Sequence, residues 1–175
     1  MKTLSIFFGM ILFMSLASPA VYADKKAETK KQLDALNLKI KEAGDKGDLQ
    51  ASIQAAEEVI TFTEDHFGKK SLEYARAMNN AANLYLFANY PSNAERLYKS
   101  AILIETKRLK GDDPALADSF YNLAMAYAVQ NKYKEARSML TKSYDIRLKK
   151  LGSDHPETQK TQQAIRQVIS DSISS

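Results

Sequence analysis

Three asparagines lie within five residues at positions 79, 80 and 83, and a further asparagine lies at position 122. A side-chain amide carries both a hydrogen-bond donor and an acceptor, so it can pair with another polar group in either direction. Asn79 and Asn83 are four residues apart, and residues with that spacing share one face of a helix. Because asparagine is a poor helix former, we expect that something other than local helix stability keeps three of them together.

Catalytic motifs are absent from the sequence. There is no cysteine, which excludes a cysteine nucleophile, a thiolate metal site and a disulfide scaffold. The two histidines, His66 and His155, fall in segments expected to link helices, and no HExxH, Gly-rich phosphate loop or GxSxG motif is present. Glu57 and Glu58 are adjacent, so on a helix they point about 100° apart and cannot face each other as an acid/base pair. We predict a non-catalytic protein with no cofactor and no metal.

The composition is that of an ordinary globular protein. The chain has 175 residues, of which 45% are hydrophobic and 26% charged, so disorder and a polytopic membrane protein are disfavoured. Six glycines and four prolines are few, which favours helix. The formal net charge of +4 comes from Lys and Arg interleaved with acids, whereas nucleic-acid binding needs a concentrated basic stripe. We therefore predict no nucleic-acid partner.

The N-terminus has the parts of a secretory signal peptide. Lys2 precedes an apolar run from Leu4 to Leu16, and the segment ends in small residues up to Ala23. The run is shorter than the roughly 20 residues that span a bilayer. The sequence therefore predicts a signal peptide at residues 1–23, cleavage before Asp24, and an exported protein, periplasmic or secreted and bacterial, with no membrane contact after cleavage.

The elements around the asparagines repeat along the chain. At an offset of 42, identical residues coincide: Asn80 with Asn122, Ala82 with Ala124, Tyr85 with Tyr127, Asn89 with Asn131, Ala94 with Ala136 and Pro114 with Pro156. A weaker first copy places Gly47 on Asn89, and Gly68 matches Gly152 at twice the period. A fixed period of this length is typical of stacked structural repeats.

Each copy is expected to form two helices. In the third copy, Phe120, Leu123 and Tyr127 recur with helical spacing, which indicates an apolar stripe. Asn131 follows, and asparagine tolerates the left-handed conformation of a tight turn between helices. A helix with one apolar stripe cannot bury it alone, so neighbouring copies must stack. A last apolar face, made of Ala164, Ile165, Val168 and Ile169, predicts a capping helix.

This pattern resembles the tetratricopeptide repeat (TPR). The resemblance is carried by three pairs of positions: Ala82 and Ala124 at the small position of the first helix, Tyr85 and Tyr127 at its tyrosine, and Ala94 and Ala136 at the alanine of the second helix. The 42-residue period and the stretch Leu151-Gly-Ser-Asp-His-Pro156 are similar to the kinesin-light-chain type. The resemblance covers residues 32–175. The first copy departs from it, because Leu38 stands at the expected asparagine.

The resemblance implies a fold and a site. The fold is an all-α, right-handed helix-turn-helix solenoid of about three TPR-like repeats (33–74, 75–116 and 117–158) with a C-terminal capping helix (159–173), in a domain covering residues 24–175. The first helices of such repeats line a concave groove that binds peptides, and in the kinesin-light-chain type a first-helix asparagine resembles a clamp for peptide backbone. The groove residues implied here are Arg76, Asn79, Asn80, Asn83, Tyr121, Asn122 and Met125.

The asparagines admit a second interpretation, in which Asn80 and Asn122 hydrogen-bond between neighbouring helices and only stabilise the stack. The function implied by the resemblance is an exported, non-catalytic adaptor or scaffold whose partner is a protein or peptide segment. An alternative is a self-associating scaffold that uses the apolar solenoid end around Ile165 and Ile169. An enzyme or small-ligand protein built on the repeat ranks below both.

Overall fold

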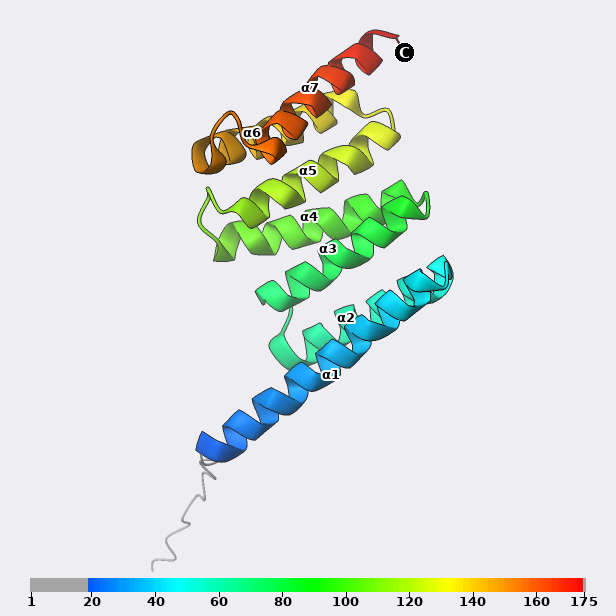
Figure 1. Cartoon of the computed structure of the whole chain (residues 1–175), viewed down its shortest axis with the longest axis vertical. Helices are drawn as coiled ribbons and strands as arrows, with labels where there is room; N and C mark the ends of the chain where they lie inside the picture. The colour runs from blue at the N-terminus through cyan, green and yellow to red at the C-terminus, as the bar shows by residue number, and fades with distance from the viewer. Residues whose placement is uncertain (1–18, 175) are drawn as a thin grey trace, which may run out of the picture.

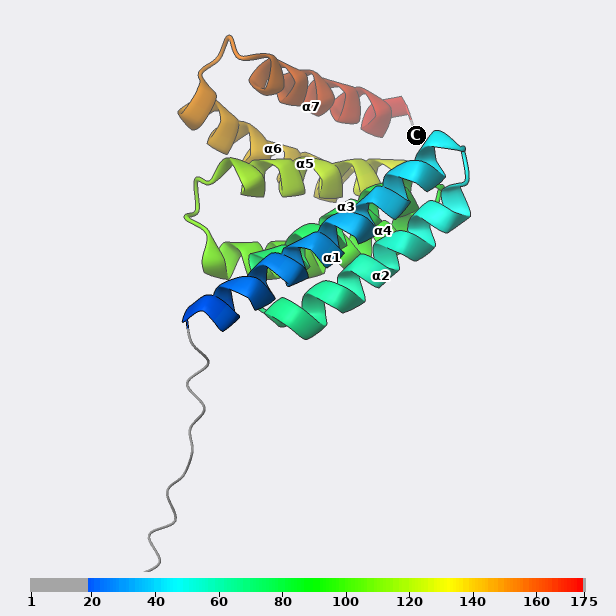
Figure 2. The same cartoon turned by 60° about the horizontal axis from the view of Figure 1, so that its bottom comes forward.

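The computed structural model describes residues 19–174, and this part of the chain forms seven helices stacked one after another (Figures 1 and 2). They are α1 (Pro19–Asp45), α2 (Leu49–Phe67), α3 (Leu72–Phe87), α4 (Pro91–Arg108), α5 (Pro114–Val129), α6 (Tyr133–Leu151) and α7 (Pro156–Ser174). Each helix packs against the next along the chain, and α3 also contacts α5. The odd-numbered helices form one layer of the stack and the even-numbered helices the other (Figure 1). The predicted all-α solenoid with a capping helix is confirmed.

The helix starts follow the predicted period. Helices α3, α5 and α7 begin at residues 72, 114 and 156, and α2, α4 and α6 begin at 49, 91 and 133, so both series advance by 42 residues. The predicted repeats and cap start at 75, 117 and 159, three residues inside the helices, and α1 begins at 19 rather than 33. Residues 1–18 of the predicted signal peptide lie outside the described residues, and residues 19–23 form the start of α1.

The turns and caps explain where the helices stop and start. Asn89 and Asn131 lie in the middle of the α3–α4 and α5–α6 turns with φ of 62° and 58°, and Gly47 takes a φ of 70° at the same repeat position. Asparagine and glycine are the residues that adopt this left-handed conformation most readily. Asp113 caps α5 by accepting a hydrogen bond from the backbone N–H of Ala115 at 3.0 Å. This satisfies one of the unpaired donors at the start of the helix.

The main core runs through all the helix pairs. Small side chains lie fully buried where helices approach closely: Ala75, Ala82, Ala94, Ala101, Ala124 and Ala136. Tyr98 of α4 is also completely buried, and its hydroxyl donates to Asn83 Oδ1 of α3 at 2.5 Å. A separate apolar cluster contains Leu116, Ala117, Phe120 and Ile146, from α5 and α6. The apolar stripes predicted from the sequence therefore stack helix on helix, as amphipathic helices in a repeat array must.

The apolar face of α7 packs inward. Val168 is buried in the main core, and Ala164 and Ile165 pack partly buried against it. Ile173, near the end of the helix, is 80% exposed. Most of the face that was the alternative surface for self-association is therefore used by the fold. No helix within residues 19–174 is long and apolar enough to cross a membrane.

Candidate functional site

Five of the seven predicted groove residues meet in one pocket between α3 and α5, with α4 as its floor. The pocket encloses about 250 Å³ and is called the α3–α5 pocket below. It is lined by Leu72, Arg76, Asn79, Asn80, Asn83, Glu105, Leu109, Ala115, Asp118, Ser119 and Asn122. The first-helix asparagines of successive repeats are thus brought to the same hollow, because α3 and α5 are adjacent in one layer.

A neighbouring hollow continues the site towards α1. It encloses about 310 Å³ between α1 and α3 and shares Asn80 and Asn83 with the α3–α5 pocket. Asn37 and Lys41 of α1 line its other side. Sequence reasoning missed Asn37, because it stands one residue before Leu38, the position that the 42-residue register aligns with Asn80. The two hollows place amides from α1, α3 and α5 along one face of the solenoid.

Asn80 and Asn122 make no side-chain hydrogen bond to any described residue. Asn80 is exposed and Asn122 is half-buried. Their amides therefore do not join neighbouring helices within residues 19–174, which disfavours the interpretation that they only stabilise stacking. Asn83 differs from them, since its Oδ1 already accepts one hydrogen bond, from Tyr98.

Asn79 has a structural role. Its Nδ2 donates to Glu105 Oε1 of α4 and to Ser119 Oγ of α5, both at 2.8 Å. One amide thereby ties three helices together beneath the pocket. Glu105 is only 5% exposed, and this burial raises the pKa of its carboxyl group against the opposing influence of Ser119, Asn79 and Arg76. Asn79 Oδ1 and Glu105 Oε2 are both buried and have no hydrogen-bond partner among the described residues.

Tyr121 and Met125, the two other predicted groove residues, do not line the α3–α5 pocket. Met125 packs half-buried against the main core. The Tyr121 ring lies 5.1 Å from the Arg147 guanidinium and 5.2 Å from the Lys160 ammonium, measured to the ring centroid. Tyr121 occupies the repeat position of Asn79, so an aromatic ring lies against Arg147 where Asn79 hydrogen-bonds to Glu105.

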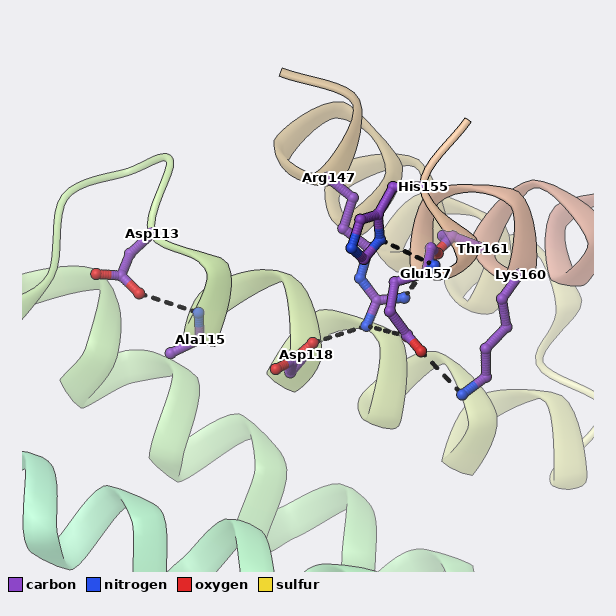
Figure 3. A network of polar contacts seen from close by, with 8 residues as sticks. All are labelled: Asp113, Ala115, Asp118, Arg147, His155, Glu157, Lys160 and Thr161. Carbon is purple, nitrogen blue, oxygen red and sulfur yellow. Dashed lines mark hydrogen bonds and ion pairs between the residues drawn. The ribbon is translucent and has the colours of Figure 1, made fainter. Parts of the chain in front are cut away.

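Arg147 is the centre of a polar network that joins α5, α6 and α7 (Figure 3). It is only 5% exposed. Its guanidinium contacts Asp118 Oδ1 at 2.7 Å, Glu157 Oε2 at 3.2 Å and Thr161 Oγ1 at 2.7 Å. The neighbouring Glu157 also contacts Lys160 at 3.9 Å. This paired network satisfies a buried cation, which is the condition under which a charge is tolerated in a protein interior.

The Arg147 network and the α3–α5 pocket occupy equivalent repeat positions. Adding 42 converts Glu105 into Arg147, Arg76 into Asp118, Ala115 into Glu157 and Ser119 into Thr161. We call the set α3, α4 and α5 the α3–α5 junction, and the set α5, α6 and α7 the α5–α7 junction. The signs of the two central charges are reversed between them. The buried charge is fully paired only in the α5–α7 junction.

A larger cleft lies on the even-numbered layer, between α2 and α4. It encloses about 610 Å³, and its apolar lining includes Ile60, Met78 and Leu103. Arg96 also lines it and makes no ion pair with a described residue. At the equivalent place one repeat later, the side chains of the Leu116–Phe120–Ile146 cluster pack together. The cleft contains none of the predicted site residues.

The two histidines lie at helix ends. His66 Nδ1 is 2.9 Å from the carbonyl oxygen of Phe62, and the two rings stack at 4.0 Å. His155 Nδ1 accepts a hydrogen bond from the backbone N–H of Glu157 at 3.2 Å, at the start of α7. Both contacts are structural. Residues 19–174 contain no group of three or more acidic or histidine side chains placed to hold a metal ion.

Comparison with known proteins gives the class of the fold. Residues 116–157 match the sequence model of the tetratricopeptide repeat family. No curated protein matches the chain. A kinesin light chain structure from Podosopora anserina with nearly identical TPR-like repeats has a TM-score of 0.73 and 19% identity, covering 82% of this chain and 69% of that one.

Two further structures have the same fold. BtubC (BKLC) from P. vanneervenii has a TM-score of 0.73 and 17% identity, covering 81% of this chain and 57% of that one. The TPR2B domain of yeast Sti1, solved as a complex with pHsp70, has a TM-score of 0.61 and 16% identity, covering 81% and 98%. The fold is therefore a tetratricopeptide-type helical solenoid, and residues 116–157 form one such repeat. The resemblance to kinesin-light-chain-type repeats, predicted from the 42-residue period, is confirmed.

Proposed function

We propose that the chain is a non-catalytic adaptor that binds a peptide segment of another protein along the hollows between α1, α3 and α5. The observation that carries this proposal is that Asn80 and Asn122 both line the α3–α5 pocket and that neither side-chain amide is hydrogen-bonded within residues 19–174. An amide side chain can donate to and accept from one peptide unit, whatever the sequence of the peptide. The complex that the TPR2B domain forms with pHsp70 supports the proposal by analogy of fold.

The structure constrains the size of the ligand. The two hollows, of about 250 and 310 Å³, are each small for a drug-sized molecule but adjacent. A short extended segment that crosses α3 would place successive residues over the two hollows, with Asn80 and Asn83 between them. We expect modest affinity, because a short groove offers few contacts to offset the cost of ordering a peptide.

A peptide panel tests the proposal. The full chain is screened against randomised eight-residue peptides, in parallel with the double variant Asn80→Ala/Asn122→Ala and the control Gln54→Ala, which removes an exposed amide on α2. We expect the double variant to lose binding at least tenfold while its unfolding free energy changes by less than about 0.5 kcal/mol, since both amides lack partners in the fold. The control should bind like the parent.

Other results would count against the proposal. Absence of any binder, or binders that ignore the double substitution, would remove the groove as the site. Unfolding of the double variant would favour the stacking interpretation instead.

The self-associating scaffold remains an alternative proposal. Its surface is reduced by the packing of α7, but Ile173 is exposed at the end of the solenoid. A molar mass that rises with concentration, and that falls back on Ile173→Asp, would favour it.

We also propose that the protein is exported, on the basis of residues 1–23 alone. Mass spectrometry of the protein from its native host tests this, because cleavage at the predicted site leaves Asp24 as the first residue.

A further inference from the structure

The α3–α5 pocket contains two acceptor atoms that the proposed backbone clamp does not use. Glu105 lines the pocket at 5% exposure, and its Oε2 has no hydrogen-bond partner among the described residues. Asn79 also lines the pocket, and its Oδ1 is likewise buried without a hydrogen-bond partner among the described residues. A buried polar atom without a partner is costly, and such atoms are rare enough in native structures to require an explanation. What is lacking here is a donor.

Arg76 does not supply this donor. It is exposed, and no ion pair within 4.0 Å joins it to Glu105 or to any other described acid. The other charged side chain of the pocket, Asp118, is an acid whose carboxylate pairs with Arg147 on the neighbouring junction. The lining therefore contains two acids, Glu105 and Asp118, and one base, Arg76. Of the two acids, the buried one, Glu105, has no ion-pair partner among the described residues.

The α5–α7 junction shows the same arrangement with the buried charge satisfied. There Arg147 occupies the place of Glu105, and Glu157 reaches it from the start of α7 at 3.2 Å. The residue equivalent to Glu157 in the α3–α5 junction is Ala115, whose methyl group cannot reach the floor. The short side chain of Ala115 leaves space above Glu105, at the position where Glu157 carries the charge that pairs with Arg147 in the α5–α7 junction.

We propose that the α3–α5 pocket receives a lysine or arginine side chain of the bound peptide, whose cation pairs with Glu105 above Ala115. This inference rests on the proposed function and adds the chemistry that the groove selects. Ammonium and guanidinium groups are donors only, so they match the unpartnered oxygens of Glu105 and Asn79. A volume of about 250 Å³ suits one side chain better than a drug-sized ligand.

The first test uses the peptides selected by the panel. We expect lysine or arginine at one fixed position, and replacement of that residue by norleucine or citrulline should weaken binding at least tenfold. Glu105→Gln, which keeps the shape and removes the charge, should weaken binding of the cationic peptide equally. The two changes together should cost little more than either alone, because they remove one interaction.

A pH series separates charge pairing from a structural effect. Burial raises the pKa of Glu105, so the ionised fraction increases with pH and affinity for the cationic peptide should rise as Glu105 ionises. The other charged groups that face it are Arg76 on α3, and Asp113 and Asp118 on the α5 side. Glu105→Gln should flatten the slope, whereas Asp118→Asn should leave it in place.

A second variant keeps the inference testable should Glu105→Gln fail to fold. Ala115→Lys places a tethered cation where Glu157 stands in the α5–α7 junction, and Ala115→Gln is its uncharged control of similar reach. We expect Ala115→Lys to compete with the cationic peptide and weaken its binding at least tenfold, and to melt a few degrees above Ala115→Gln.

The failures are distinguishable. If peptides bind in a manner that depends on Asn80 and Asn122 but show no preference for a cation, or if neither Glu105→Gln nor Ala115→Lys changes binding, the inference is overturned and the proposed function stands. If no peptide binds, or if binding ignores Asn80 and Asn122, the proposed function fails and the inference fails with it.

Discussion

The α3–α5 and α5–α7 junctions are built from the same repeat positions and reach opposite results. In the α5–α7 junction, buried Arg147 is paired with Asp118 and Glu157 and covered by Tyr121. In the α3–α5 junction, buried Glu105 accepts a hydrogen bond from Asn79, makes no ion pair with a residue of the described range 19–174, and lies beneath a pocket. The first arrangement pairs its buried charge within the chain, and the second leaves Glu105 Oε2 and Asn79 Oδ1 without a hydrogen-bond partner among residues 19–174.

The difference between the junctions comes from a few side chains on a shared backbone. The helix starts differ by one period of 42 residues, so the backbone frames are equivalent. Tyr121 replaces Asn79 and Glu157 replaces Ala115, and in both cases the larger side chain is in the filled junction. The comparison teaches that a repeat solenoid can leave a pocket at one junction through shorter side chains while larger side chains occupy the equivalent positions of the next junction. We propose that this pocket is the ligand site.

The largest expected effect on the unfolding free energy comes from a substitution in the α5–α7 junction. Arg147→Met should lower the unfolding free energy by about 3 kcal/mol, because it leaves Asp118, Glu157 and Thr161 without their shared donor and loosens α7. Urea denaturation followed by circular dichroism measures this, with exposed Arg137→Met on the same helix as the control. A loss below about 1 kcal/mol would show that the network is not what holds the cap.

Placing the charges of the α5–α7 junction in the α3–α5 junction should give the α3–α5 junction a paired buried cation. Glu105→Arg alone should destabilise the protein by about 2 kcal/mol, because it buries a cation beside the Asn79 donor and in the same pocket as the cation of Arg76. Adding Arg76→Asp creates the pair that Asp118 and Arg147 form, and should recover at least about 1 kcal/mol. The full double-mutant cycle in urea measures the coupling. Additive effects of the two substitutions would mean that the junctions are not interchangeable.

The last prediction concerns the pH dependence of stability, which two glutamates of α4 should change in opposite directions. Contacts from Lys132, Lys99 and Gln130 outweigh partial burial and lower the pKa of Glu95 to about 2. A lowered pKa stabilises the fold above the ordinary value of 4.5, and this contribution disappears as pH falls towards 2. Glu95→Gln should therefore cost on the order of 2 kcal/mol at pH 7 and progressively less on acidification.

Glu105 should show the opposite sign. Its raised pKa favours the fold at low pH, and this contribution is lost as pH rises through the raised value. Relative to the parent, Glu105→Gln should thus gain stability with increasing pH. Urea denaturation of Glu95→Gln and Glu105→Gln between pH 3 and pH 8 measures the two pH dependences. The prediction would be contradicted if the unfolding free energies of both variants, relative to the parent, changed with pH in the same direction.

Much of the site was visible in the sequence. The period placed Asn80 and Asn122 at equivalent positions, and the structure brings them with Arg76, Asn79 and Asn83 into one pocket. The period could not distinguish Asn79 from the neighbouring asparagines, because the hydrogen bonds from Asn79 to Glu105 and Ser119 depend on contacts across three helices. Nor did the period mark Tyr121 as a residue that stacks on Arg147, because a repeat position predicts location and says nothing of which partner fills the space.

The sequence by itself determined the helices, their turns and their order. These depend on local preferences that each repeat carries within itself, such as the left-handed turn at Asn131, the cap at Asp113 and the apolar stripe of α5. Only the tertiary structure decided which polar side chains are used and which are left free. Glu105 and Arg147 are buried at the same repeat position, but pairing depends on side chains that other helices bring within a few ångströms, and that proximity exists only in the folded stack.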